Sequence, residues 1–181
     1  MASIERTAYP RFKRYYTVNE LKEIYTPTLS EIAFGRTSTT GEDNYLNLIV
    51  LLKSFQRLGY FPKLSEIPDA VINYIRTFLQ LPKNLDLGYQ YPPTLSRHKQ
   101  AIRSYLQVSQ FNQETHKFIR EIIKQSALVR DNPADLINVA IEELVKNRYD
   151  LPPFATLDRL VRHGRNLVNQ QLFSQVTSQR A

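Results

Sequence analysis

The sequence predicts an all-α protein built from two consecutive helical lobes. Apolar residues recur three and four positions apart along most of the 181 residues, which is the spacing of an amphipathic helix. Turn-forming residues fall between these blocks, and the strict alternation of a β-strand is nearly absent. An apolar content of 42% is enough for each lobe to bury a core.

Two short helices are expected first. Thr17 and Glu20 have the spacing of a capping box, so a helix should run over residues 18–25. A second short helix covers about residues 29–34. The polar run over residues 35–43 is expected to form a loop that leads into the core.

A long central helix and a fourth helix complete the first lobe. Residues 44–58 are apolar on almost every side and precede Gly59, a pattern typical of a buried helix that ends in a left-handed cap. Pro68 fits the first turn of a helix over residues 69–81, and Pro82 closes that helix.

A domain boundary is predicted near residue 89. Residues 82–93 combine three prolines, one glycine and little periodicity, a composition typical of a linker. The first lobe therefore comprises residues 1–88 and the second residues 89–181.

Four helices are expected in the second lobe, starting near residues 94, 112, 132 and 156. Asn132 and Pro133 form a cap followed by a proline at the first helical position. Thr156 is the expected N-cap of the last helix, which should run to about Val176.

The charge points to a polyanionic partner. The formal net charge is +7 and the isoelectric point is near 9.6, an excess that favours nucleic acid or an acidic membrane surface. Residues 1–90 hold 11 basic and 9 acidic side chains and residues 91–181 hold 13 and 8, so the second half contributes +5. The arm over residues 6–16 carries further cations and no acid.

Several classes of site are disfavoured. The chain has no cysteine, and its three histidines lie far apart in sequence without the spacing of a metal motif. It has no glycine-rich phosphate loop, and neighbouring carboxylates on amphipathic helices are more often solvated than catalytic. We therefore expect no enzymatic activity, no metal and no cofactor. The absence of a long apolar run or a leader predicts a cytoplasmic protein without a membrane span.

Basic residues on the predicted helices of the second lobe are the strongest functional lead. The last helix places cations and amide side chains opposite its apolar side, and such groups can read base edges in a major groove. Arg165 lies at the edge of that helix, where it could reach phosphate. The helix from residue 94 should show a second cationic face. The candidate DNA contacts of this lobe are Arg97, His98, Lys99, Arg103, Arg159, Arg162, His163, Arg165 and Asn166.

The first lobe offers a polar loop and the basic arm. Hydroxyl groups are common phosphate partners, and a basic arm can lie in a minor groove. The candidate DNA contacts of this lobe are Arg11, Lys13, Arg14, Arg36, Thr37, Ser38, Thr39 and Asn44. Each lobe is thus expected to be a helix-turn-helix-like DNA-binding unit. A solvated surface, a helical protein–protein adaptor, a peripheral membrane binder and an enzyme fragment remain as alternatives.

Three segments resemble the N-terminal region of replicative transposases of the Tn-three family. They are "NYLNLIVLLKSFQRLGYFP", "HKQAIRSYLQV" and "LPPFATLDRLVRHGRNLVNQQLFSQV", and the likeness spans about residues 12–176. The "LPPFATLDRLV" segment with its following basic helix is the most specific of them. The sequence departs from the family at Tyr45, because members often carry a basic residue after the asparagine that opens the central helix, here Asn44.

The resemblance implies a part of a bacterial, nucleoid-associated transposase that binds double-stranded DNA at the terminal inverted repeats of its transposon. In such a protein the catalytic Asp-Asp-Glu residues lie far downstream, so this chain would carry none of them. Its partners would be the repeat DNA and the rest of the transposase chain, and a homodimer is compatible with the full-length protein.

Overall fold

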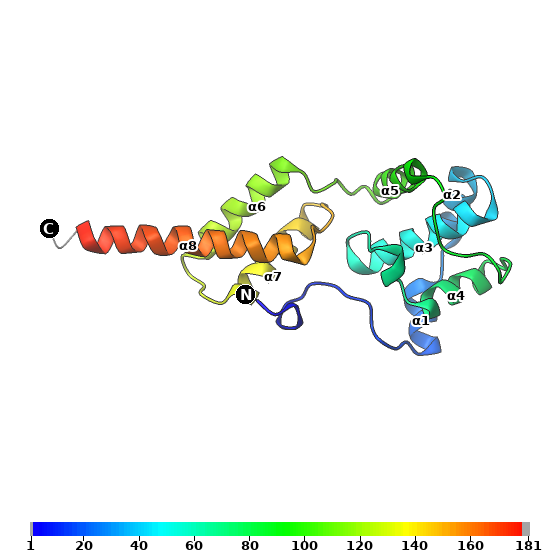
Figure 1. The fold of residues 1–181 in the computed structure, drawn as a ribbon, viewed down its shortest axis with the longest axis horizontal. Helices are drawn as coiled ribbons and strands as arrows, with labels where there is room; N and C mark the ends of the chain where they lie inside the picture. Colours follow the sequence, from blue (N-terminus) through cyan, green and yellow to red (C-terminus); the bar gives the residue numbers. More distant parts are fainter. Residues whose placement is uncertain (1, 179–181) are drawn as a thin grey trace. The chain divides into compact units, whose positions relative to one another are not determined.

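The computed structural model describes the backbone of residues 2–178, and within that range every regular element is helical (Figure 1). The all-α prediction is confirmed. Only an isolated bridge between Ser109 and Tyr149 has β character among these residues. The helices are η1 (Ile4–Arg6), α1 (Val18–Tyr25), α2 (Leu29–Ser38), α3 (Glu42–Leu58), η2 (Leu64–Glu66), α4 (Asp69–Phe78), α5 (Pro92–Leu106), α6 (Gln113–Ser126), α7 (Pro133–Lys146) and α8 (Phe154–Ser178).

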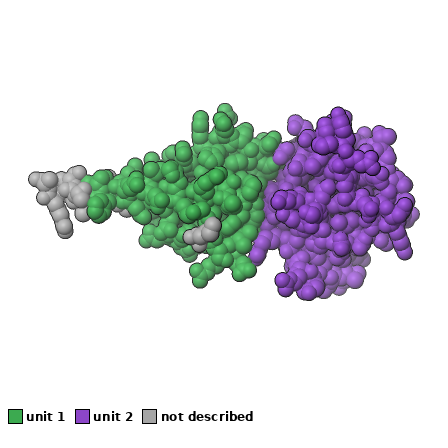
Figure 2. Space-filling view, in the orientation of Figure 1, with its two compact units in different colours: residues 1–9, 108–181 green, residues 10–107 purple. Residues whose placement is uncertain are grey.

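The chain forms two compact units that are interleaved in sequence (Figure 2). Residues 10–107 form one unit, here called the α1–α5 unit. Residues 1–9 and 108–181 form the other, here called the α6–α8 unit. The units therefore change over after Gln107, whereas sequence composition predicts a boundary near residue 89. The physical reason lies in α5, which packs against α3 of the α1–α5 unit and buries Ile102 completely.

Helix α3 is the core of the α1–α5 unit. Helices α1, α2, α4 and α5 all pack against it, and every residue from Tyr45 to Phe55 is buried. The predicted C-cap is confirmed, because Gly59 has a φ of 74° and its N–H bonds to the carbonyl of Phe55. Such a backbone angle favours glycine, which has no Cβ to clash.

Local capping signals were predicted correctly where their partners are close in sequence. The Thr17 side chain accepts from the N–H of Glu20, and the Glu20 carboxylate accepts from the N–H of Thr17. Asn132 likewise caps α7, and Pro133 occupies its first position. These bonds satisfy backbone N–H groups that the first turn of a helix leaves without partners.

Helix α2 extends four residues beyond its predicted end at Phe34, and α3 begins at Glu42. The expectation of a loop over residues 35–43 is therefore wrong over residues 35–38 and 42–43. Gly35 allows the extension, since an added Cβ there would lie 2.6 Å from Tyr45 Cε2 and 2.8 Å from Ile49 Cδ1. Close packing of α2 on α3 therefore selects a helical glycine, which sequence propensity alone disfavours.

Helices α4 and α8 also have boundaries that differ from the prediction. Helix α4 ends at Phe78 instead of residue 81, and Gln80 takes a left-handed φ of 56°. Helix α8 begins at Phe154, so Thr156 lies inside the first turn and is not the N-cap. Pro153 explains this earlier start, because its carbonyl accepts from the N–H of Thr156.

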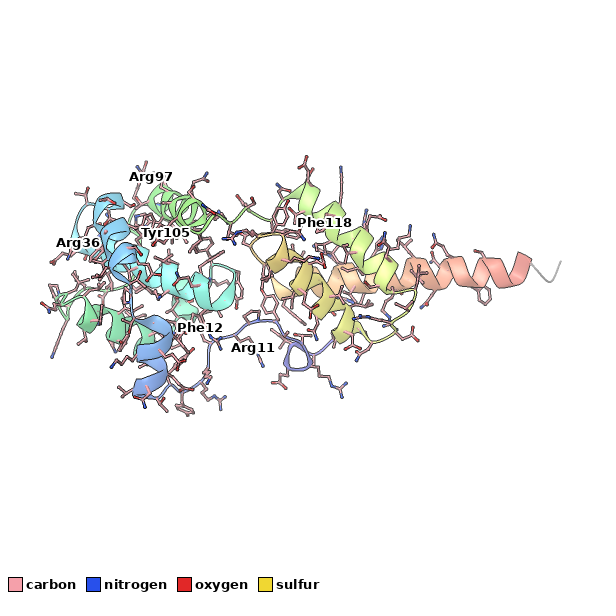
Figure 3. The ribbon with its side chains drawn as sticks, turned by 180° about the vertical axis from the view of Figure 1, so that it is seen from behind. Arg11, Phe12, Arg36, Arg97, Tyr105 and Phe118 are labelled. Carbon is pink, nitrogen blue, oxygen red and sulfur yellow. The ribbon has the colours of Figure 1, made fainter. Side chains whose placement is uncertain are left out.

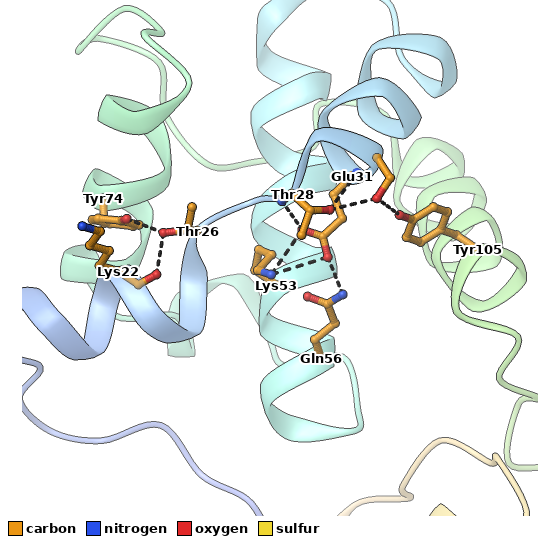
Figure 4. Close-up of polar contacts among 9 residues, drawn as sticks. Lys22, Thr26, Thr28, Glu31, Lys53, Gln56, Tyr74 and Tyr105 are labelled. Atoms are coloured by element: carbon orange, nitrogen blue, oxygen red, sulfur yellow. Dashed lines mark hydrogen bonds and ion pairs between the residues drawn. The ribbon is translucent and has the colours of Figure 1, made fainter.

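A buried polar cluster joins α2 to α3 (Figure 4). The Glu31 carboxylate lies 3.2 Å from Lys53 Nζ and accepts a hydrogen bond of 2.6 Å from Gln56 and one of 2.8 Å from the Thr28 N–H. Only 6% of the Glu31 side chain and 8% of the Lys53 side chain are exposed. A buried carboxylate of this kind needs such partners to offset its desolvation.

The α6–α8 unit is a three-helix bundle whose helices all contact one another. Helix α8 runs past the ends of α6 and α7 (Figure 1). Helices α6 and α8 approach closely at Gly164, where an added Cβ would lie 2.8 Å from Ile123 Cγ2.

The amino-terminal segment completes this bundle. Tyr9 is buried, stacks edge-on against Phe154 and donates a hydrogen bond to the carbonyl of Pro152. Asn138 on α7 accepts from the N–H of Ala8. Residues 2–9 are therefore part of the folded unit and not a free basic tail.

Candidate nucleic-acid interface

Helix α8 presents the predicted polar stripe. Arg159, Arg162, His163 and Asn166 are all exposed, and Arg165 is half-buried at the edge. The opposite side of the helix is buried against the bundle through Leu157, Leu160, Val161, Gly164 and Val168. Packing therefore fixes which side of α8 is offered to a partner.

The two arginines that start the stripe have different surroundings. The Arg162 guanidinium lies 3.1 Å from the Asp158 carboxylate, whose side chain is only 2% exposed. The other oxygen of Asp158 accepts from the N–H of Ala2. Arg159 has no ion pair within the described part of the chain. Arg159 consequently carries its full charge to the surface, whereas Arg162 is partly neutralised and held in place.

Helix α5 does not show the predicted cationic face. Arg97 is exposed, but Lys99 and Arg103 lie on another side, over the ring of Phe61 at 5.6 and 5.0 Å. His98 is buried and hydrogen-bonded through Nδ1 to the Tyr89 hydroxyl. Burial, with a smaller effect from Arg97, lowers the pKa of His98, so its ring is neutral at pH 7. The sequence pattern predicts that Arg97, His98, Lys99 and Arg103 are all presented to a partner, because it cannot show which side of α5 covers α3.

Another aromatic contact also holds α5 in place. The Tyr105 ring, labelled in Figure 3, stacks on Phe34 of α2 at 4.3 Å. Its hydroxyl donates to Ser30 (Figure 4). Helix α5 is thus fixed to the unit by side chains on several of its faces. Arg97 is the exposed member of the predicted α5 set, and its guanidinium donates to the Thr94 hydroxyl at 3.4 Å.

The basic arm is partly anchored. Arg11 (Figure 3) and Arg14 are exposed. Lys13 forms an ion pair with Glu20 at 2.5 Å. The hydrogen bond from Lys13 lowers the pKa of Glu20 to about 2, with help from the Thr17 N–H. The Tyr60 hydroxyl donates to the carbonyl of Pro10 at the start of the arm.

The polar residues at the end of α2 and the start of α3 use many of their donors internally. The hydroxyl of Thr37 donates to the carbonyls of Ala33 and Phe34, and that of Thr39 to Gly35. The Asn44 amide donates to the carbonyl of Thr40. A phosphate accepts hydrogen bonds, so hydroxyls already donating to the backbone are poorer partners for it.

The remaining members of this group are better placed. Ser38 is exposed. The Arg36 guanidinium is exposed and lies over the Tyr45 ring at 4.0 Å (Figure 3). This cation–π contact orients the guanidinium without neutralising its charge.

Sequence reasoning missed a group of cations on α6. Lys117 and Arg120 are exposed and Lys124 is half-buried. Their spacing of three and four residues is the signal that could have found them. A cavity of about 430 Å³ opens beside them at the amino end of the helix, and its lining residues are Phe111, Asn112, Gln113, His116, Lys117 and Arg120.

No helix in the part of the chain that the structure describes is long and apolar enough to cross a bilayer. Among residues 2–178, no group of three or more histidine, aspartate or glutamate side chains is placed to hold a metal ion.

The fold and its exposed arginines define an all-helical protein with cationic faces. Residues 1–164 match the family described as a domain of unknown function, DUF4158, and the chain belongs to this family. It is also 30% identical over 138 residues to the transposase for transposon Tn1546 of Enterococcus faecium, a match that covers 75% of this chain. The chain is therefore related to transposases, and the matched part spans 14% of that relative's length.

Proposed function

We propose that this chain is the DNA-binding part of a replicative transposase of the Tn-three family and binds the terminal inverted repeats of its transposon. The observation that carries the proposal is the exposed stripe on α8, with Arg159, Arg162, His163 and Asn166 opposite a buried apolar side. Arginine can bind guanine through two hydrogen bonds and asparagine can do so with adenine. An exposed helix face with both residue types has the chemistry for reading base edges.

The charge distribution favours DNA over the alternative of a protein adaptor. Five arginines are exposed and form no ion pair with an acidic side chain within the described residues: Arg11, Arg14, Arg36, Arg97 and Arg159. Exposed arginines suit phosphate, because the guanidinium donates several hydrogen bonds in a fixed plane. Arg36 and Arg97 in the α1–α5 unit would contribute backbone contacts, and the α8 stripe would contribute base contacts.

Similarity to a transposase supports the ends of a transposon as the DNA that is bound. An enzyme that moves a defined element has to recognise the ends of that element, so its DNA-binding part requires sequence specificity. In this proposal the catalytic Asp-Asp-Glu residues and the remaining partners belong to the rest of a longer transposase. The module itself binds and positions the repeat.

Selection from random duplexes, followed by competition against a scrambled duplex, tests the proposal. The expected result is enrichment of one sequence, with specific affinity at least about 1,000-fold above non-specific affinity at physiological salt. The logarithm of the affinity should fall with the logarithm of salt concentration by about 0.9 per phosphate contact. Weak, salt-independent binding without enrichment would reject DNA recognition. Binding to anionic vesicles with no preference for DNA would favour a membrane-surface protein.

A further inference from the structure

The cations of α6 form one continuous face. At about 100° per residue, Lys117, Arg120 and Lys124 fall within about 60° of the helix circumference. The buried residues Thr115, Ile119 and Ile123 define the opposite, core-facing side. This set, here called the α6 basic face, lies outside the residues assigned above to DNA reading.

The α6 basic face borders α8. Ile123 is the residue that meets Gly164 of α8, and the backbone N of Lys124 lies 3.9 Å from the Cβ position of that glycine. Arg120 is one turn before Ile123, on the same edge of α6. By the same helical geometry, the acids Glu114 and Glu121 lie on the side of the basic face away from α8. Positive charge is therefore concentrated toward the helix that carries the polar stripe.

The backbone amides at the amino end of α6 do not form the site. The Asn112 side chain already accepts from the N–H groups of Glu114 and Thr115 and from the Thr115 hydroxyl. Attraction for an anion at this end of α6 consequently comes from side chains. His116 and Arg120 line the cavity of about 430 Å³ beside the helix, together with Lys117.

The spacing of packed helices relates the two faces to DNA. A B-DNA major groove is roughly 12 Å wide, and packed helices have axes about 8–10 Å apart. A helix in the groove therefore brings its neighbour over the rim, where the phosphates lie. The glycine at the crossing favours the short end of this range, because no side chain separates the helices there.

We propose that the α6 basic face binds the phosphate backbone that flanks the groove read by α8. Lys117, Arg120 and Lys124 supply the cations, and the contacts are independent of base sequence. This inference rests on the proposed function and adds a second role to the α6–α8 unit. It assigns positioning on the duplex to α6 and base reading to α8.

The experiment compares two triple variants of the full chain that lose the same charge. One is K117Q/R120Q/K124Q. The control is R6Q/R130Q/K146Q, which removes three exposed cations of the same unit that lie outside α6 and α8. Fluorescence anisotropy with the selected duplex and a scrambled duplex at 50–200 mM salt reports affinity and salt slope, and circular dichroism confirms folding. The conservative variant K117R/R120K/K124R keeps the charge.

The α6 triple variant should reduce the slope of log affinity against log salt by about 2.7. Its loss of affinity between 50 and 200 mM salt should therefore be about 40-fold smaller than that of the original chain. Its ratio of specific to non-specific affinity should stay unchanged, and the conservative variant should match the original chain. An equal effect of the control triple would mean that only net charge matters, and this would overturn the inference. Unchanged binding by the α6 variant would overturn it as well, while leaving the proposed function intact. An original chain that binds no duplex overturns both.

Discussion

Arg162 lies 3.1 Å from Asp158, one helical turn earlier on α8, and the Asp158 side chain is almost wholly buried. Arg159 lies on the same exposed side without such a partner among the described residues. Two neighbouring arginines of one stripe therefore differ in how they are held. A buried carboxylate restrains Arg162, and Arg159 has no such restraint within the described residues.

Arg159→Ala should change sequence preference without changing stability. Truncating a side chain at a base edge costs about 1–3 kcal/mol at one or two base pairs. The measurement is competition between the selected and scrambled duplexes, with thermal unfolding as a check of the fold. Arg165→Ala is the matched control, because a phosphate contact should weaken both duplexes alike. An unchanged ratio for Arg159→Ala would remove this residue from base reading.

Arg162→Ala should affect both binding and folding. The Arg162 side chain is 51% exposed, so its ion pair with Asp158 stabilises the unit by no more than about 1 kcal/mol. Asp158→Asn tests the pair from the other side, since its amide oxygen can still accept from Ala2 while Arg162 is released. We expect this second variant to bind scrambled duplex more tightly at low salt. Equal binding by Asp158→Asn and the original chain would argue against Arg162 contacting DNA.

Gly164→Ala should destabilise the α6–α8 unit. Alanine gains about 1 kcal/mol in helix propensity over glycine, but overpacking against Ile123 costs about 1–3 kcal/mol. The 2.8 Å approach to Ile123 Cγ2 makes the second effect the larger. Chemical denaturation checks the sign.

Ile123→Leu provides the matched background for that measurement, because leucine has no methyl group at Cγ2. In this background Gly164→Ala should cost less than it does alone. A double-mutant cycle with no coupling between the two positions would show that the α6–α8 contact does not determine the effect.

Acid should weaken the α1–α5 unit through Glu31. Burial alone would raise the pKa of Glu31, but the Thr28 N–H, Gln56 and Lys53 together hold it below the ordinary value. The group therefore contributes stability above the unfolded-state pKa, near 4.3, and that contribution is lost as pH falls below it. Urea unfolding between pH 3 and 7 should show this loss, and it should be smaller in a Glu31→Gln variant.

Replacing both partners of this ion pair should be milder than replacing one. Glu31→Gln leaves Lys53 buried without its counter-ion, at a cost of about 3–5 kcal/mol, whereas the double variant E31Q/K53M removes the unpaired charge. A double variant less stable than Glu31→Gln would contradict this account of the cluster.

Tyr9→Ala should destabilise the α6–α8 unit. Removing a buried aromatic ring costs about 3–5 kcal/mol, and Tyr9 packs on Phe154 and bonds to Pro152. Tyr9→Phe keeps the ring and should lose only about 1 kcal/mol. Separate expression gives an independent check: residues 10–107 should fold alone, and residues 108–181 should gain stability when a peptide of residues 1–9 is added.

The sequence by itself determined the helical class, most helix positions and the exposed stripe of α8. Thr17 with Glu20, Asn132 with Pro133, and Gly59 act on backbone groups within four residues, so their effect is readable without a fold. The apolar spacing of α8 likewise determines its buried side, and the polar residues have to take the other one.

Only the tertiary structure decided how the helices are shared between units and which cations stay at the surface. Packing of Ile102 places α5 in the α1–α5 unit, and packing of Tyr9 places the amino-terminal segment in the α6–α8 unit. The partners of both residues are far away in sequence. The same long-range packing buries His98, extends α2 past Gly35 and brings Ile123 of α6 against α8 at Gly164. Periodicity shows that a helix has an apolar side, but only packing determines what that side covers.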